Sequence, residues 1–479
     1  MRGVRIAWAA LAFMAAPAVA QAWNAGPWVA DLEAMRAAFR AKYANLDWME
    51  QERGLPLDRS FDAAVAAVRQ AGDDGAARAV LDRMVVQIGD GHVALRWPVK
   101  GGPTVSGSVP RSYATPSALC AGLGYEAGVR PGVAAGLPGR VELAEPGEYR
   151  AATVRMDGAT LGIVRIPAFM PQAFPTRCEA VVAARPALLN APCEEACQDA
   201  VLTGAYQALT REFDAALGRL RAAGAEVLLV DLSDNGGGSE WAEALARMLS
   251  PRPRRSAATG FVRGPHWARQ WTALADRLRQ HARSARGAER VQLLVWAAEA
   301  ERGRREAELP DAPGRPRVVR LGYATGLLAE GDAALAAKPY GPYLFSAGQP
   351  AYPFRRGAWD GPVIVLVNQR TYSAAEQVAA LLQDNRVAVI LGERTGGAGC
   401  GHTAGGTPTT LPHSKAVLEL PDCVRFRADG SNEVNGVVPD VPTGQRGTDS
   451  PAFAARLVAA RLPEAVAAAR RLWAAKGQP

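Results

Sequence analysis

The chain has 479 residues, which is enough for two or three domains. Hydrophobic residues make up 48% of it and charged residues 21%, a composition that is typical of a globular protein and excludes an intrinsically disordered chain. The formal net charge of +8 comes with no nucleic-acid-binding motif, so we expect no nucleic acid among its partners.

Residues 1–22 have a basic start, an apolar, alanine-rich centre and Ala-x-Ala endings. This pattern is typical of a secretory signal peptide, and cleavage after Ala20 or after Ala22 fits it equally well. No later segment is long and apolar enough to span a bilayer, so we expect no integral membrane segment once the signal is removed. The sequence therefore predicts an exported protein, either periplasmic or secreted.

Residues 23–100 are predicted to form an N-terminal helical domain, because apolar side chains recur in them at helical spacing. The last of these helices ends at Asp90-Gly91, and a short alternating strand pattern follows. His92 lies at this break, where a histidine can point into a cleft. A hydrogen-bonded structural histidine is the alternative interpretation.

The rest of the chain is divided by composition and pattern. Residues 101–160 are rich in glycine and proline and are expected to form an irregular connecting segment. Residues 161–445 alternate between apolar strands and helices, which predicts an α/β domain. Within it, residues 251–345 are predicted to be a helical insertion, and residues 446–479 are predicted to close the chain with a helical segment.

A run of glycines follows the predicted strand Ala225–Asp231 and precedes a helix. Gly236, Gly237 and Gly238 permit positive φ and close backbone approach. Their N–H groups could form a nest for an anion or an oxyanion, whereas a flexible turn is the alternative.

Ser373 lies where a second buried strand, Pro362–Val367, gives way to a segment of helical spacing. A serine at such a junction can present its Oγ at the end of a sheet, beside N–H groups at the positive end of a helix dipole. That is a suitable place for a nucleophile. The alternative is a simple helix cap, which Glu376 would complete as a capping box.

The chain also holds four ordered motifs: DLSDNGGG at 231–238, VNQRTYSAAE at 367–376, LGERTGGAG at 391–399 and NGVVPD at 435–440. Together they resemble the tail-specific, or C-terminal processing, serine peptidase family. The resemblance implies a crotonase-like core of ββα repeats beside an N-terminal helical bundle. It also implies a peptide or protein substrate, with no metal or cofactor. Many members carry a PDZ domain near residues 101–160, but its carboxylate-binding loop is not found in this sequence.

The general base cannot be the lysine that the processing branch of this family uses. Ala398 stands at that position, and no lysine of the chain falls in the motif. The tricorn-like branch uses a histidine on an earlier segment, and GDGHVALR at 89–96 resembles that segment. His92 is therefore the candidate base, and His402, close to the missing lysine, is its competitor.

The resemblance implies the remaining site residues. Glu433 is where the tricorn-like pattern has a glutamate, which fixes the histidine directly or through water, whereas Gly91 replaces a serine of that pattern. N–H groups of Gly237 (or Gly236) and Ala374 are expected to hold the oxyanion. The implied reaction is hydrolysis of a peptide bond through an acyl-enzyme.

Six cysteines agree with export, because an even number in an oxidising compartment favours disulfides. Cys400 and Cys423 bracket one hairpin-like region and are expected to pair, while the other connectivities stay open. Cys193 and Cys197 could be half of a metal site, but a second pair of ligands is not evident. Cys120 and Cys178 complete the set of disulfide candidates.

Two other functions compete with a peptidase. A non-catalytic peptide- or ligand-binding protein on the same fold is suggested by Ala398 and Gly91. An esterase-like hydrolase is disfavoured, because Ser373 lacks the Gly-x-Ser-x-Gly elbow. The sequence does not predict the natural substrate or the oligomeric state.

Overall fold

The structure is a computed structural model that describes residues 23–98, 112–143, 147–156, 158–252, 254–310, 312, 314–324, 328, 338–341, 352–403 and 406–475. The predicted signal peptide and its cleavage site lie outside these residues. No helix among the described residues combines the length and the apolarity needed to cross a bilayer.

A mixed sheet of seven strands forms the centre of the molecule, which confirms the predicted α/β class. Its parallel strands are short apolar runs that are buried on both faces, as the β-branched sequences predict. In sheet order the strands are β13 (Val441–Pro442), β9 (Ala388–Gly392), β8 (Val363–Val367), β5 (Val227–Asp231), β4 (Ala159–Arg165), β3 (Ala151–Met156) and β2 (Arg140–Glu142). Strands β4, β5, β8, β9 and β13 are parallel, so the segments that follow β5 and β8 meet at one edge.

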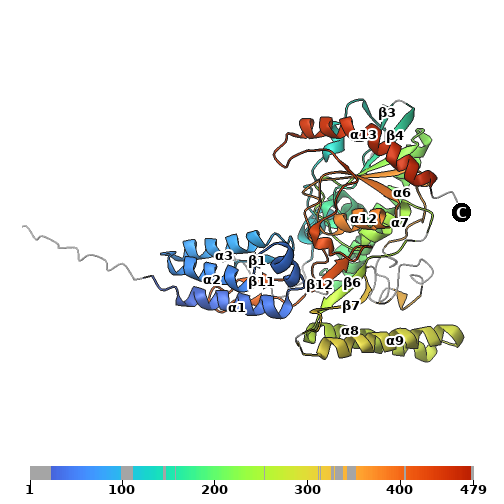
Figure 1. Ribbon diagram of the computed structural model, residues 1–479. Helices are drawn as coiled ribbons and strands as arrows, with labels where there is room; N and C mark the ends of the chain where they lie inside the picture. The colour runs from blue at the N-terminus through green and yellow to red at the C-terminus, as the bar shows by residue number, and fades with distance from the viewer. Residues whose placement is uncertain are drawn as a thin grey trace, which may run out of the picture.

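Helices cover both faces of this sheet (Figure 1). One face packs against α6 (Glu195–Ala222), α7 (Trp241–Met248) and α12 (Ala374–Asp384). The other face packs against α13 (Pro451–Ala474), whose apolar stripe contacts β5, β8 and β9.

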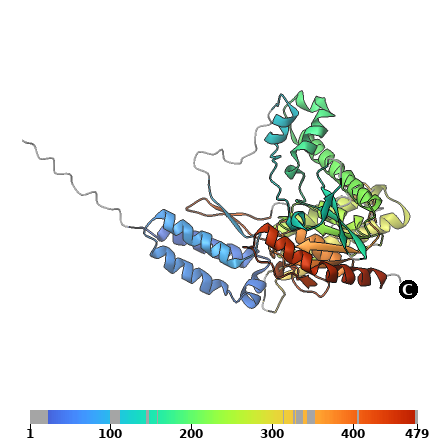
Figure 2. The same ribbon diagram turned by 90° about the horizontal axis from the view of Figure 1, so that it is seen from above.

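The N-terminal helices are α1 (Gly26–Lys42), α2 (Leu57–Arg69) and α3 (Asp74–Ile88), with a π-helical turn at Trp48–Glu52. They extend away from the sheet in both views (Figures 1 and 2). After α3 the chain enters β1 (Ala94–Arg96), which pairs with β11 (Val417–Glu419), itself paired with β10 (Thr409–Thr410). This pairing brings the break at His92 next to segments that are more than 300 residues later in the chain.

The segment expected to be irregular contains more structure than its composition suggests. Its described part holds α4 (Pro116–Gly122), a 3-10 turn at Val133–Gly136, and strands β2 and β3. Helix α4 packs against α5 (Pro175–Ala183), to which a disulfide joins it. Further 3-10 turns are formed by Pro171–Ala173, Pro186–Leu189 and Glu433–Asn435.

The insertion contains the helical hairpin α8 (Pro265–Ser284) and α9 (Gly287–Glu308), which lies beside the main body (Figure 1). Strands β6 (Ala258–Val262) and β7 (Val318–Tyr323) flank this hairpin. Both belong to a three-stranded sheet, in which β6 also pairs with β12 (Cys423–Phe426). Strand β12 thereby connects the insertion to the segment around Ser373, because Arg425 of β12 donates to the carbonyl of Ser373.

Candidate active site

Ser373 lies directly before α12, in the turn that follows β8. Its φ of 53° is positive, which is uncommon for a residue with a side chain and costs about 1–3 kcal/mol. The turn is held there because the N–H of Tyr372 donates to the carbonyl of Asn235, in the glycine loop. In this conformation the Oγ of Ser373 lies 3.1 Å from Nε2 of His92.

His92 has a second hydrogen bond that decides which ring nitrogen carries the hydrogen. Its Nδ1 lies 2.7 Å from the carbonyl oxygen of Ala398. A carbonyl oxygen can only accept, so Nδ1 is the donor in the neutral ring. Nε2 is then free to accept the hydroxyl hydrogen of Ser373, which is the arrangement that a general base requires.

Asp90 holds the backbone at this histidine. Its buried carboxylate accepts hydrogen bonds from the N–H of His92 at 3.0 Å, the Asn45 amide at 2.8 Å and the Tyr43 hydroxyl at 3.0 Å. Burial raises the pKa of the Asp90 carboxyl, against the effect of these donors. The sequence marked this residue only as a helix breaker, and its role in shaping the break depends on contacts from another part of the N-terminal domain.

The pKa of the His92 imidazole is lowered from its usual value. Burial is the main cause, and the nearby charges of Arg425 and His402 act in the same direction. Asp90 and the Ala398 carbonyl oppose the shift. The imidazole is therefore neutral at neutral pH, in the state that accepts a proton.

His402 is close to His92 but is not directed at Ser373. The two ring centroids are 6.0 Å apart, and Nδ1 of His402 lies 3.1 Å from the carbonyl oxygen of Leu420. Among the described residues it makes no hydrogen bond to Ser373. The geometry thus brings His92, and not His402, to the serine hydroxyl.

The glycine loop packs directly against Ser373. A Cβ atom at Gly237, whose φ is +98°, would lie 2.8 Å from Cβ of Ser373 and 2.9 Å from the nitrogen of Ala374, so only glycine fits there. The N–H of Gly237 donates to Oδ1 of Asn235 at 2.8 Å. In the described part of the chain, the N–H groups of Gly236 and Ala374 have no acceptor, and they are the expected donors that remain free for an oxyanion.

Glu433 is not brought to His92. Its buried carboxylate accepts hydrogen bonds from the Arg425 guanidinium, at 2.6 Å from Nη2 and 3.0 Å from Nε. No hydrogen bond joins Glu433 to His92 within the described residues. Arg425 was not predicted, since an isolated arginine in a strand carries no sequence signal of its partners.

Glu376 does more than cap α12. Its buried carboxylate accepts from the N–H of Ser373 at 2.9 Å, as a capping box requires. It also accepts from the Thr395 hydroxyl at 2.6 Å and from the N–H groups of Gly397 at 2.7 Å and Ala398 at 2.8 Å. Burial, with the nearby Glu433 charge, raises the pKa of Glu376 to about 7. This residue attaches the loop that carries the Ala398 carbonyl to α12 and to Ser373 before it.

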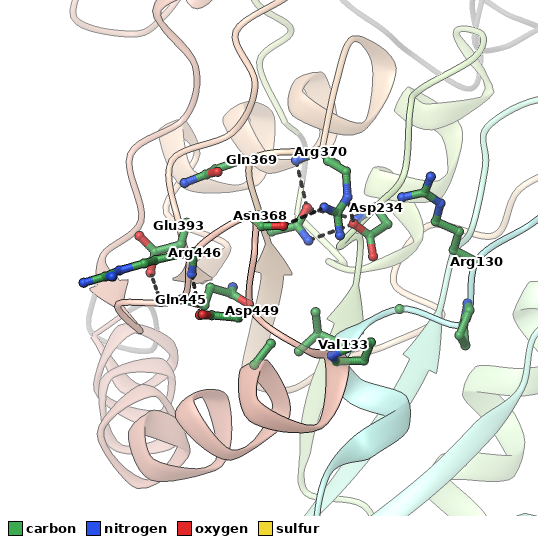
Figure 3. A pocket seen from close by; sticks show the side chains of 15 residues that line it. Arg130, Val133, Asp234, Asn368, Gln369, Arg370, Glu393, Gln445, Arg446 and Asp449 are labelled. Atoms are coloured by element: carbon green, nitrogen blue, oxygen red, sulfur yellow. Dashed lines mark hydrogen bonds and ion pairs between the residues drawn. The ribbon is translucent and has the colours of Figure 1, made fainter.

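On its other side, the turn before Ser373 lines a pocket at the edge of the sheet (Figure 3). Here Oδ1 of Asn368 accepts from the N–H groups of Asp234 and Arg370, both at 3.0 Å. The Asp234 carboxylate is also paired with the Arg370 guanidinium. These contacts connect the start of the glycine loop with the turn before Ser373.

All six cysteines are paired in the structure. Cys400–Cys423, the expected pair, lies beside the site, and the other disulfides are Cys120–Cys178 and Cys193–Cys197. The described residues hold no group of histidine, cysteine and acidic side chains that could bind a metal ion.

Comparisons with known proteins agree with this geometry. The sequence model of peptidase family S41 matches residues 160–443, which is more than half of the chain. Among solved structures, mature CPAF is 16% identical with a TM-score of 0.57, over 95% of this chain and 99% of that one. Mature CPAF complexed with lactacystin is also 16% identical, with a TM-score of 0.58 over 94% of this chain and 99% of that one. At this identity the likeness concerns the fold. No curated protein matches the sequence.

Proposed function

The chain belongs to peptidase family S41 and is a serine peptidase, and from this premise we propose that Ser373 is its nucleophile and His92 its general base. The observation that carries the proposal is the pair of hydrogen bonds of His92. Nε2 is 3.1 Å from the serine Oγ, while Nδ1 is held at 2.7 Å by the Ala398 carbonyl. With Ala398 in place of the family's lysine, we assign the chain to the branch that uses a histidine base.

The mechanism begins with attack by the Ser373 Oγ on the carbonyl carbon of the scissile peptide bond. His92 takes the hydroxyl proton on Nε2 and then gives it to the leaving amine, which leaves an acyl-enzyme on Ser373. Water, activated by the same imidazole, then hydrolyses the ester. The Ala398 carbonyl keeps the ring in the required tautomer and accepts the Nδ1 hydrogen of the imidazolium.

The tetrahedral intermediate carries a negative oxygen that needs donors. The N–H groups of Ala374 and Gly236 face no acceptor in the described residues and come from the two loops that meet at Ser373. Ala374 is also the first residue of α12, where the helix dipole favours an anion. We assign the oxyanion hole to these two groups, each worth about 3–4 kcal/mol in the transition state.

The compartment and the substrate follow from the chemistry of the chain. Six paired cysteines suit an oxidising compartment, and together with the predicted signal peptide they support export to the periplasm or the medium. The substrate is proposed to be a peptide or protein, bound at the edge of the sheet where the strands β5 and β8 end.

A fluorophosphonate probe tests this proposal, because it reacts only with an activated serine. The purified mature protein should be labelled, and a peptide map should place the label on Ser373. Ser373→Ala should lose both the label and all cleavage of a denatured protein substrate, with an almost unchanged melting temperature. Ser284→Ala, at the exposed end of α8, is the matched control and should be labelled normally. A non-catalytic binding protein would give no label in any variant.

A further inference from the structure

Arg425 is hydrogen-bonded to the turn that carries Ser373 and to the loop that follows Ala398. It lies on β12, it is buried, and its guanidinium is paired with Glu433. Its Nη2 also donates to the carbonyl of Gly399 at 2.7 Å and to the carbonyl of Ser373 at 3.3 Å. Its Nη1 donates to Oε1 of Gln377 at 3.1 Å. One side chain therefore contacts both segments that build the site.

The two carbonyls belong to segments whose spacing decides the hydrogen bonds of His92. Ser373 and Gln377 are on the nucleophile turn and the first turns of α12. Gly399 directly follows Ala398, whose carbonyl holds Nδ1 of the imidazole. A change in the distance between these segments would move the imidazole relative to the Ser373 Oγ, and misplacement by about 1 Å can cost about 10²-fold in rate.

Glu433 neutralises the buried charge of the Arg425 guanidinium. An unpaired guanidinium in the interior would be strongly unfavourable, and Glu433 neutralises it with both carboxylate oxygens. Both oxygens of Glu433 are thereby bonded to Arg425, and no hydrogen bond joins this carboxylate to His92 within the described residues. The acceptor on Nδ1 is instead the Ala398 backbone.

We propose that Arg425 is a positioning residue for the peptidase reaction, which fixes the spacing between the Ser373 turn and the Ala398 loop, and that Glu433 acts on catalysis only through Arg425. This inference rests on the proposed roles of Ser373 and His92. It differs from a triad in which Glu433 acts directly on the imidazole.

The charge of Arg425 supplies a readout that a merely structural residue would lack. Among the described residues, the charged or titratable groups with the main influence on the pKa of His92 are Asp90, Arg425 and His402. Of these, Asp90 favours the imidazolium, whereas Arg425 and His402 disfavour it. Removal of the Arg425 charge should therefore raise the pKa of His92 and move the acid limb of the activity profile to higher pH.

A double-mutant cycle on kcat/KM tests whether Glu433 acts through Arg425. The variants are Arg425→Gln, Glu433→Gln and the double variant, each checked by circular dichroism and thermal melting. We expect each single variant to lose about 10²-fold in kcat and kcat/KM, and the double variant to lose about as much as Arg425→Gln alone. We also expect the acid limb of Arg425→Gln to move to higher pH. The inference would be overturned if the losses of the two single variants add in the double variant. It would also be overturned if the acid limb of Arg425→Gln stays at the pH of the wild type.

The chain offers a matched control directly after the end of β12. Arg427 pairs with Asp384 at 2.7 Å and is bonded neither to Ser373 nor to the Ala398 loop in the described residues. Arg427→Gln/Asp384→Asn makes the same charge change and should keep its kcat within about twofold.

If the single variants at Arg425 and Glu433 do not fold, the charge-neutral double variant Arg425→Gln/Glu433→Gln is compared with this control alone. Full kcat in the folded double variant would overturn the inference.

The outcome is separable from that of the proposed function. If Ser373 is not labelled by the fluorophosphonate probe, or His92→Ala stays fully active, the assignment of nucleophile and base fails. If both of those results are as expected but the cycle is additive, only the role of Arg425 fails.

Discussion

Nδ1 of His92 lies 2.7 Å from the carbonyl oxygen of Ala398, so a backbone group holds the position that a carboxylate has in a serine–histidine–aspartate triad. Ala398 also stands where the processing branch of the family has its lysine. The loop that lacks the usual lysine thus supplies the group that orients the proposed base, His92.

The first prediction concerns which histidine is the base. His92→Ala should lower kcat by about 10²–10⁴-fold, because it removes the only ring nitrogen that is hydrogen-bonded to Ser373 in the described residues. His402→Ala should cost much less, since its ring is bonded to the Leu420 carbonyl. Steady-state kinetics on one peptide substrate gives both values. An inactive His402→Ala beside a normal His92→Ala would reverse the assignment.

The second prediction concerns the pH dependence of kcat/KM. Burial and the charges of Arg425 and His402 lower the pKa of His92, and the imidazole must be neutral to accept the serine proton. Activity should therefore rise with pH through an ionisation below the usual histidine value of about 6.5, and it should be complete at neutral pH. The profile is to be measured with an uncharged substrate. A midpoint well above that value would contradict a buried, neutral His92.

Local sequence signals, read with the family resemblance, selected Ser373 and His92 as candidates, and the structure brings their side chains within 3.1 Å. Ser373 lies at a strand-to-helix junction, and His92 lies at a helix break. The parallel strands were equally evident as apolar runs.

The supporting contacts could not be predicted in the same way. The orienting group on His92 is a backbone carbonyl, 306 positions away, and any residue at that position has one. Arg425 and Glu433 are only eight positions apart, yet whether Glu433 contacts the imidazole or the guanidinium depends on how β12 packs below α12. Strand β3 was missed because the glycine- and proline-rich composition of the segment before it hid a short alternating pattern.

The third prediction concerns the buried Glu376 carboxyl, whose pKa is raised to about 7. In the unfolded chain this group loses its proton near its ordinary value of 4.5. Between these two pKa values the folded state binds more protons than the unfolded state. The contribution of the protonated Glu376 carboxyl to the free energy of unfolding is therefore complete at low pH and is lost as the pH rises through about 7. The free energy of unfolding of the wild type should fall over this range relative to that of Glu376→Gln. Urea unfolding at pH 5 and pH 8 measures this difference, and parallel changes in the two proteins would contradict the raised pKa.

The fourth prediction concerns the disulfide beside the site. Cys400 follows the Ala398–Gly399 segment, and Cys423 lies on β12 two positions before Arg425, so the bond ties the orienting loop to the strand below the nucleophile. Its cysteines are 23 positions apart, and closing a loop of this size stabilises a protein by about 3 kcal/mol. Cys400→Ser/Cys423→Ser should therefore lower the melting temperature and also lower kcat, because the Ala398 carbonyl is less firmly held.

The matched control for this prediction is Cys193→Ser/Cys197→Ser, which opens a disulfide with a separation of only 4 positions, at the start of α6. Because loop-closure entropy grows with loop length, this variant should lose less stability. It should also keep its kcat, since both cysteines pack in the cluster around α4, α5 and the start of α6, away from the described contacts of Ala398 and β12. Non-reduced peptide maps of the wild type should show both bonds and no free thiol. Equal losses of kcat in the two double variants would mean that the Cys400–Cys423 bond contributes only to general stability, because a local effect on His92 cannot arise from Cys193.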